Sequence, residues 1–208
     1  MFGNVRITKK ISFADLKQGK VSYFDVYESQ VNSWIFEPAE CLAKLRSNGD
    51  TDKGMAILAL LLMFFEPHGQ YLTGEEGGSR RKFVFAFERF VKFLIENKRI
   101  NEEITKLKAD SFYKFARCGL FHSLKLSNEL LINVFDIGGT SILKNPLFSE
   151  GWIVSPWILL DDMKAYLEHY VKELKQPAST TLIENFNKTF NRLLIEPMEY
   201  FFERESKL

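Results

Sequence analysis

The residues of this sequence whose types and spacing best suit catalysis are Arg117 and His122, which lie five positions apart. They belong to the segment FYKFARCGLFHS, residues 112–123. A histidine can accept and donate a proton near neutral pH. An arginine can bind phosphate oxygens and stabilise the charge that builds up on them in a transition state. The pair therefore has the groups needed to cleave RNA by attack of a 2′-hydroxyl on the adjacent phosphate, without a metal ion.

The spacing of this pair is weak evidence when taken alone. The chain contains nine Arg and three His, so roughly 0.1–0.2 pairs of this spacing are expected by chance. On an ideal helix, five positions correspond to a rotation of about 140°, which predicts that the two side chains do not share one tight face. Gly119 between them is expected to loosen the helix. The alternative interpretation is structural: Arg117 pairs with a carboxylate, and His122 caps or packs within a helical bundle.

Three further residues of this region are candidates for RNA binding. Lys114 lies one helical turn before Arg117 and could contact a phosphate, although such a lysine is more often simply solvated. Tyr113 could stack on a base, but a core position is favoured by about two to one. Lys125, at the end of the same basic segment, completes the set. The sequence contains no Cys and His cluster with metal-ligand spacing, so it predicts neither a metal site nor a cofactor.

The segment from Arg117 to His122 resembles the Arg-x4-6-His signature of HEPN domains, a family of helical proteins that includes many metal-independent RNA-cleaving enzymes. The similarity extends upstream, over about residues 50–125. A hydrophobic helix leads to Gly69-Gln70-Tyr71-Leu72 and a polar loop, and the helix of residues 80–93 follows. The resemblance implies an endoribonuclease of a toxin or phage-defence type, with Arg117 and His122 as its catalytic residues.

The resemblance also implies a homodimer, because HEPN proteins typically pair so that two motifs line one groove. One residue departs from the family pattern. Active members often carry Asn, Asp or His directly after the arginine, and this chain has Cys118. Two alternatives to catalysis therefore stay open: a non-catalytic HEPN-like module that binds RNA or a nucleotide, and a dimerisation or scaffold module with a Phe-rich surface.

The elements that position this pair are predicted to be mainly helical, because apolar residues recur at helical spacing along most of the chain. A break is expected at Pro67-His68-Gly69, and kinks are expected at Pro38 and Pro197. Helices are expected over residues 24–46, 51–65, from about 80 to 94, 104–124, 156–174 and 179–204.

A change of pattern after Leu126 predicts a small β element. Short apolar runs between turn residues are typical of strands. Strands are expected over residues 130–135, 142–144 and 152–154, and a further short one over 5–13. The expected architecture is a single HEPN-like helical bundle over residues 1–208, with a small antiparallel β insertion at about 129–155 and a C-terminal helical pair at about 156–204.

Composition and charge set limits on the class of protein. The chain has 208 residues, of which 46% are hydrophobic and 20 are Phe, and this favours one domain with an aromatic core.

The two cysteines and the lack of a secretory signal favour a reducing, cytoplasmic location. The apolar run of residues 55–65 is too short to span a membrane. Residues 80–125 carry 12 Lys and Arg against five Asp and Glu, a pattern typical of a segment that binds a polyanion or of a solvated helix face.

The remaining histidines and a pair of acidic residues are not expected to do chemistry. His68, beside Pro67 and Gly69, is predicted to be a helix-end residue, and His169 an exposed helical one. The pair Asp161-Asp162 is interpreted as a solvated face near the start of a helix, where carboxylates complement the helix dipole.

Overall fold

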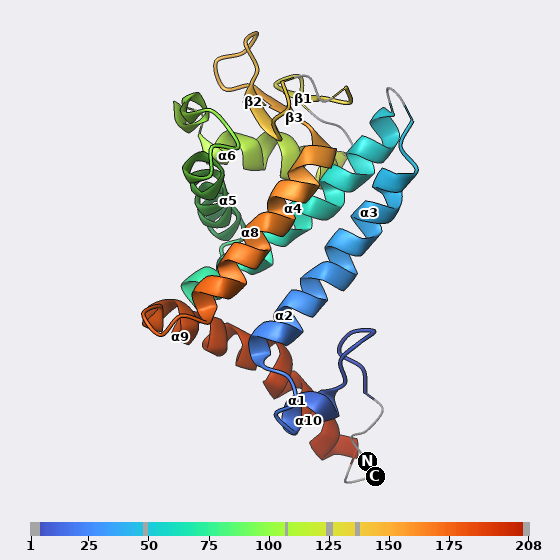
Figure 1. The fold of residues 1–208 in the computed structure, drawn as a ribbon, viewed down its shortest axis with the longest axis vertical. Helices are drawn as coiled ribbons and strands as arrows, with labels where there is room; N and C mark the ends of the chain where they lie inside the picture. The colour runs from blue at the N-terminus through green and yellow to red at the C-terminus, as the bar shows by residue number, and fades with distance from the viewer. Residues whose placement is uncertain (1–4, 48–49, 107, 124–126, 136–137, 206–208) are drawn as a thin grey trace.

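The computed structural model describes residues 5–47, 50–106, 108–123, 127–135 and 138–205. The described part is mainly α-helical and carries a small three-stranded sheet (Figure 1). The expected mainly α class with a small β insertion is therefore confirmed. In place of the strand expected at the start of the chain there is an isolated bridge between Arg6 and Ser12. The short helix α1 (Phe13–Lys17) follows this bridge, capped by the Ser12 side chain.

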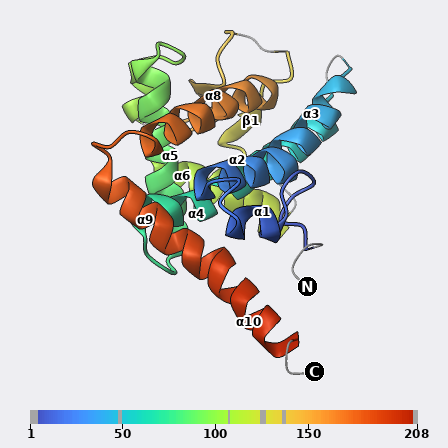
Figure 2. The same ribbon diagram turned by 60° about the horizontal axis from the view of Figure 1, so that its bottom comes forward.

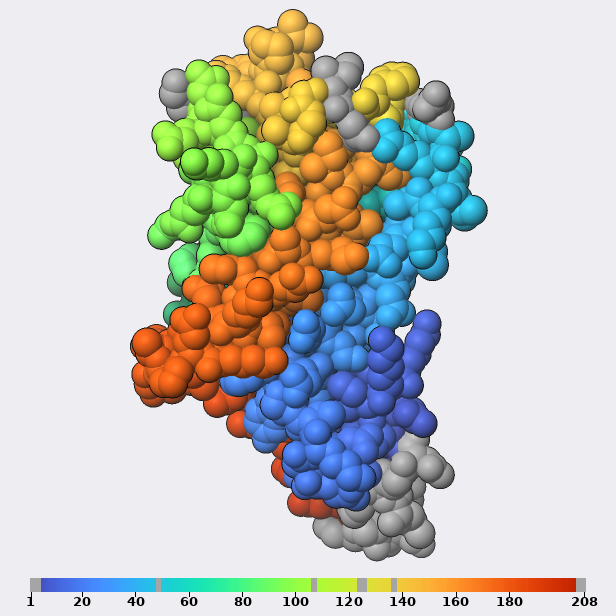
Figure 3. Space-filling model, viewed as in Figure 1, coloured from blue at the N-terminus to red at the C-terminus, as the bar shows by residue number. Residues whose placement is uncertain are grey.

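Helix α4 (Thr51–Thr73) forms the centre of the bundle. It packs against α3 (Glu37–Lys44), α5 (Ser79–Glu96), α8 (Pro156–Leu174) and α9 (Thr180–Phe190). In the space-filling view of Figure 3, α8 covers much of the front face, beside α3. Helix α4 is also long and apolar enough to cross a membrane, with 56% of its most apolar window buried in the protein. A central core helix passes the same test.

The expected break at Pro67-His68-Gly69 is wrong, because α4 continues through these residues and ends at Gly74 in the left-handed conformation. Tertiary packing explains the continuation. Helix α5 crosses α4 at Gly69, and a Cβ atom there would lie 2.2 Å from the backbone carbonyl oxygen of Lys82. The glycine thus permits the close crossing of the two helices and does not mark a loop. Pro67 lies on the exposed side of the same helix.

The two kinks expected at prolines are wide helical turns within continuous helical segments. Helix α2 (Tyr23–Val31) passes through the π-helical segment η1 (Asn32–Phe36) into α3. Helix α9 passes in the same way through η4 (Asn191–Ile195) into α10 (Glu196–Glu205). Each proline is the second residue after its π segment. The wider turn relieves the clash between the proline ring and the carbonyl that an α-helix would place four residues earlier.

The sheet is mixed and not purely antiparallel as expected. It contains β1 (Leu130–Ile132), β2 (Ile142–Lys144) and β3 (Trp152–Val154) in the order β1-β3-β2. Strands β2 and β3 are antiparallel, since a short loop joins them. Strand β1 pairs with the other edge of β3 and runs parallel to it. Strands β1 and β2 therefore run in opposite directions on either side of β3.

Phenylalanines form most of the core beneath the motif helix. Phe65 of α4 contacts Phe83 and Phe87 of α5. Phe87 in turn stacks on Phe112 with ring centroids 4.2 Å apart. Trp152 of β3 packs on both of these rings, and its indole N–H donates to the Ser111 hydroxyl over 2.9 Å. This aromatic layer fixes the start of the motif helix against α5 and the sheet.

At the other end of the molecule, α9, η4 and α10 form a long rod that extends beyond the bundle (Figure 2). Helix α1 lies against this rod. Phe13 of α1 stacks on Phe202 of α10 with ring centroids 5.3 Å apart, and Lys17 forms an ion pair with Glu199. The first and last described helices therefore stabilise each other.

Candidate functional site

The motif lies on a helical segment that is less regular than the sequence predicts. The expected continuous helix over 104–124 is replaced by η2 (Glu102–Lys106), α6 (Ala109–Phe112), the π-helical segment η3 (Tyr113–Cys118) and α7 (Gly119–Ser123). Three apolar side chains of this segment are buried and hold it on the core: Phe112, Ala116 and Leu120. The opposite face carries the candidate residues.

Arg117 lies near the end of the π-helical segment and His122 lies in α7, and the tips of their side chains meet. The Arg117 Nη1 atom lies 3.4 Å from the His122 Nε2 atom. The sequence predicts that the two side chains do not share one tight face, and their tips nevertheless lie within contact distance. A hydrogen bond between these atoms requires Nε2 to be the acceptor, since a guanidinium group has only donors.

Glu66 of α4 forms the third member of this cluster. Its Oε2 atom lies 3.3 Å from the Arg117 Nη2 atom, and each of the two side chains is about one-quarter exposed (25% for Arg117, 27% for Glu66). The Ser79 hydroxyl, at the start of α5, donates to the other carboxylate oxygen of Glu66 over 2.6 Å. The Phe121 ring lies 5.1 Å from the Arg117 guanidinium carbon. Arg117 is therefore held on two sides while solvent reaches its remaining donors.

This arrangement bears on the structural interpretation of the motif. Arg117 does pair with a carboxylate, as that interpretation requires. His122 does not pack within the bundle, because its side chain is exposed beside the guanidinium group. The cluster thus presents a proton-transfer group and a cation to solvent at one place.

The structure separates the RNA-binding candidates. Tyr113 is half-buried, with its ring 5.1 Å from that of Phe83, and so belongs to the edge of the core. Burial, and then the neighbouring Cys118 thiol, raise the pKa of the Tyr113 hydroxyl. Lys114 is exposed, and its Nζ atom lies 5.7 Å from the Phe115 ring. Lys125 lies outside the described residues.

Many of the described basic residues between Arg80 and Arg117 form ion pairs with carboxylates. Arg80 forms an ion pair with Asp110, and the hydrogen bond from Arg80 lowers the pKa of that carboxyl group. Further cations of this stretch pair with carboxylates elsewhere in the chain. These pairs are Arg81–Glu75, Lys82–Glu75, Arg89–Glu173, Arg99–Asp162, Lys108–Glu150 and Arg117–Glu66. The folded chain thus cancels much of the charge asymmetry that the sequence displays.

Two residues outside the motif are placed differently from expectation. His68 is fully buried in the middle of α4 and does not end a helix. Asp162 is 3% exposed and pairs with Arg99, so it belongs to no solvated face. In both cases neighbouring helices cover a position that the one-dimensional pattern leaves open. His169 is on the exposed side of α8, as expected, with Nε2 3.7 Å from Glu173.

Sequence reasoning missed Glu66 and Ser79 as members of the site. One signal for Glu66 exists, because it is the only charged residue between Met55 and Pro67 in an otherwise apolar run. A lone carboxylate on a core helix usually has a partner, because an unpaired charge near the core is costly. No comparable signal marks Ser79, whose role follows from the crossing of α4 and α5.

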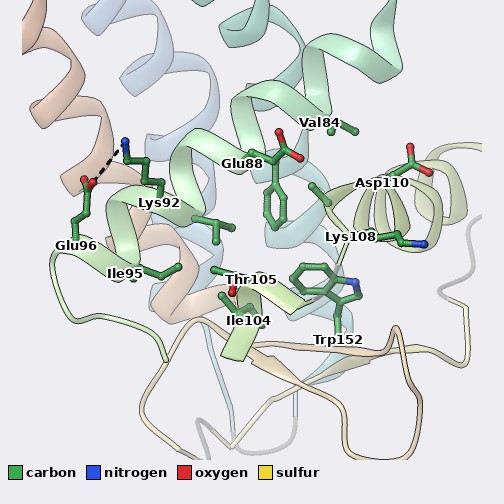
Figure 4. Close-up of a pocket in the computed structure, with 13 residues that line it drawn as sticks. Val84, Glu88, Lys92, Ile95, Glu96, Ile104, Thr105, Lys108, Asp110 and Trp152 are labelled. Atoms are coloured by element: carbon green, nitrogen blue, oxygen red, sulfur yellow. Dashed lines mark ion pairs between the residues drawn. The ribbon is translucent and has the colours of Figure 1, made fainter. Parts of the chain in front are cut away.

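A larger groove, of about 740 Å³, lies along α5 (Figure 4). Its apolar side chains come from α5, η2 and β3, with Val84, Ile95, Ile104 and Trp152 among them. Charged side chains stand at its rim, where Lys92 and Glu96 form an ion pair with 3.7 Å between Nζ and Oε1. Neither Arg117 nor His122 lines this groove. This groove and the Arg117–His122 cluster are therefore different places.

Among the residues that the structure describes, no group of three or more His, Cys, Asp or Glu side chains is placed to hold a metal ion. Comparisons of the chain with protein-family models, with curated proteins and with solved structures find no match.

Proposed function

We propose that this protein binds single-stranded RNA at Arg117 and His122 and cleaves it without a metal ion, as the resemblance to HEPN ribonucleases implies. The observation that carries the proposal is the 3.4 Å contact between the Arg117 Nη1 and the His122 Nε2 atoms at a solvent-accessible surface. A cation and a proton acceptor at this separation can act on one phosphodiester, since the guanidinium reaches the phosphate oxygens while the imidazole reaches the neighbouring hydroxyl.

The proposed reaction is an internal transfer of the phosphate. His122 Nε2 accepts the proton of a ribose 2′-hydroxyl, and the 2′-oxygen attacks the adjacent phosphorus atom. Arg117 donates hydrogen bonds to the non-bridging oxygens as negative charge builds up on them. The bond from phosphorus to the 5′-oxygen then breaks, which leaves a 2′,3′-cyclic phosphate and a strand with a free 5′-hydroxyl. The departing 5′-oxygen takes a proton from water or, in the proposed homodimer, from a protonated His122 of the second copy.

Glu66 is a positioning residue in this scheme. It fixes the guanidinium through the contact at 3.3 Å, and Ser79 fixes Glu66 in turn. The carboxylate also repels a phosphate, so a bound strand must compete with Glu66 for the donors of Arg117. This competition favours weak binding of the ground state, with stronger interaction once charge develops on the phosphate.

The decisive experiment measures cleavage of single-stranded RNA by the wild type and by His122→Ala and Arg117→Ala. Each substitution is expected to lower the rate by about 10²- to 10⁴-fold. His122→Ala should leave the melting temperature nearly unchanged, because His122 is exposed, whereas Arg117→Ala should lower it slightly, because the partly buried Glu66 loses its ion-pair partner. His169→Ala is the matched control, since it removes an exposed histidine of α8 far along the chain from the motif.

A substrate with a 2′-deoxyribose at the cleaved position supplies the chemical control and should resist cleavage. Unchanged cleavage in both motif variants would contradict the site assignment. If the wild type cleaves no RNA and both substitutions lower the melting temperature, the structural interpretation of the pair is favoured.

The second candidate function is RNA binding without cleavage. It is favoured by Cys118, which replaces the polar residue that often follows the arginine in active HEPN proteins, and by the Glu66 carboxylate on Arg117. In that case Arg117→Ala weakens RNA binding and His122→Ala changes it little, because phosphate contacts come from the cation. In that case Cys118→Asn is expected to leave the protein inactive.

A further inference from the structure

A second pocket, separate from the groove along α5, lies between α4 and the π segments η1 and η4. Its volume is about 270 Å³, below the range of about 300–1,000 Å³ that suits drug-sized ligands. Trp34 and Leu193 stand at its surface, 60% and 46% exposed respectively, while Tyr27 and Phe64 are buried deeper. The pocket therefore fits one flat, mostly apolar group.

The side chain of Trp34 is unusual among the tryptophans of this chain. Trp152 and Trp157 are 1% and 7% exposed, whereas Trp34 projects from the π segment η1 with more than half of its surface free. Exposed Trp beside a pocket with aromatic walls is a typical stacking surface for a planar ring. Wide helical turns of this kind often occur at functional sites.

The inner wall of this pocket is mostly apolar, with a few polar groups and no charge. His68 lies at its base, with its Nδ1 atom 2.8 Å from the Tyr27 hydroxyl and its Nε2 atom 2.9 Å from the Tyr166 hydroxyl. Burial lowers the pKa of His68 well below its usual value, so the imidazole is neutral at physiological pH. Gln30, half-buried in the lining, offers an amide donor and acceptor. An uncharged ring with polar edges matches this wall better than an ion does.

The pocket adjoins the Arg117–His122 site through two consecutive residues of α4. Glu66 contacts Arg117, and Pro67 lines the pocket together with Trp34. The Cα atoms of Glu66 and Pro67 are about 3.8 Å apart, as in any trans peptide. The motif and the pocket therefore adjoin neighbouring faces of the same turn of α4.

We propose that this pocket binds an unpaired base of the same RNA strand whose phosphate lies at Arg117, with the base stacked on Trp34. The proposal rests on the proposed function for its substrate, and it adds a second point of attachment on the strand. A cation and an aromatic slot on neighbouring faces of one helix match the alternation of phosphates and bases along single-stranded RNA.

The test uses the intrinsic fluorescence of Trp34, since stacking on a base quenches an indole and the other two tryptophans are buried. The probes are short 2′-O-methyl oligoadenylate and oligouridylate, which lack the attacking hydroxyl, and an abasic strand with the same backbone. The 2′-O-methyl strands are expected to quench the emission, and the abasic strand is not. Trp34→Phe should abolish the quenching while binding persists.

Affinities measured by a label on the strand complete the design. Trp34→Ala is expected to weaken binding of the 2′-O-methyl strands by roughly 5- to 100-fold and to leave the abasic strand unaffected. Arg117→Ala should weaken both. Tyr200→Ala is the control, because Tyr200 of α10 is an aromatic residue of similar exposure, at 59%.

Each outcome separates the pocket from the cleavage reaction. Quenching without any RNA cleavage supports the pocket and overturns catalysis. Arg117-dependent cleavage without quenching overturns the pocket and leaves the proposed function standing, and neither binding nor cleavage overturns both. If the Trp34 emission shifts as the protein concentration rises in the absence of RNA, a second copy covers the pocket and the proposal is overturned.

Discussion

His68 makes the stability of this protein depend on pH in a way that the geometry specifies. Its imidazole is fully buried, and both ring nitrogens are used by tyrosine hydroxyls. Burial first, and then the positive charge of Arg89, lower the pKa of His68 well below its usual value near 6.5. Below pH 6.5 the unfolded chain takes up a proton at this position and the folded chain does not. The unfolded state then binds more protons, so the free energy of unfolding must fall as the pH falls.

The magnitude follows from the same linkage. At pH 7 the imidazole of His68 is largely neutral in both the folded and the unfolded state, so its titration changes the free energy of unfolding little. Between pH 6.5 and the lowered pKa of the folded state, the loss grows toward about 1.4 kcal/mol per pH unit. Carboxyl groups with a lowered pKa, such as Asp50 at about 2, lose their contribution to stability mainly below pH 5. They therefore affect the free energy of unfolding little between pH 5 and pH 7.

Chemical denaturation of the wild type and of His68→Gln at several pH values between 5 and 7.5 tests this reasoning. The variant is expected to be less stable at pH 7, because the hydroxyl of Tyr27 or of Tyr166 loses a buried partner at a cost of about 1–3 kcal/mol. Its stability should depend less on pH, so the two curves converge as the pH falls. His169→Gln, on the exposed side of α8, is the control and should follow the wild-type curve. Parallel curves for the wild type and His68→Gln would refute the argument.

The other predictions concern packing, charge and assembly. Gly69→Ala should lower the free energy of unfolding by about 1–3 kcal/mol or more, because the new Cβ atom would meet the Lys82 carbonyl oxygen at 2.2 Å. Gly54→Ala on the same helix is the control, since its Cβ would meet a side-chain methyl of Ile132 at 3.3 Å and should cost less in thermal denaturation. Glu66→Gln should tighten RNA binding roughly two- to fivefold, as it removes a negative charge that is 27% exposed beside Arg117, and weaker binding in a filter assay would contradict this. Cleavage, where present, should survive EDTA, and restoration of lost activity by a divalent ion would indicate a different mechanism. Sedimentation should show a homodimer with the Arg117–His122 helix at or near its interface, and a strict monomer at high concentration would remove a composite site.

Patterns that repeat along the chain could be interpreted without the structure. Apolar residues at helical spacing identified the main helices, and the apolar runs after Leu126 identified all three strands, because both signals depend on neighbours in sequence. The pattern Asn-x4-Glu-Pro, which begins at Asn32 and again at Asn191, could also have been recognised. Both copies coincide with a π segment followed by a proline that the helix tolerates.

The sequence-based predictions that are wrong concern features that depend on contacts between distant segments of the chain. Pro67 and Gly69 signal a break, yet α4 continues, because the crossing with α5 needs a residue without a Cβ at position 69. Strands β1 and β3 both run opposite to β2, and only the tertiary structure decided that β1 pairs with β3, which makes that pair parallel. The basic residues after Arg80 are paired with carboxylates that are distant in sequence, as in the pair Arg99–Asp162.

The candidate site divides in the same way. The sequence by itself determined that Arg117 and His122 share a helix with an apolar face, and that the residue types suit phosphate chemistry. Only the tertiary structure decided that the two side chains touch and that Glu66 contacts the guanidinium group. It also decided that Trp34 lines a pocket together with Pro67, the residue that follows Glu66 in α4. The physical reason is that spacing fixes direction only on an ideal helix, and the motif lies partly in a π-helical segment.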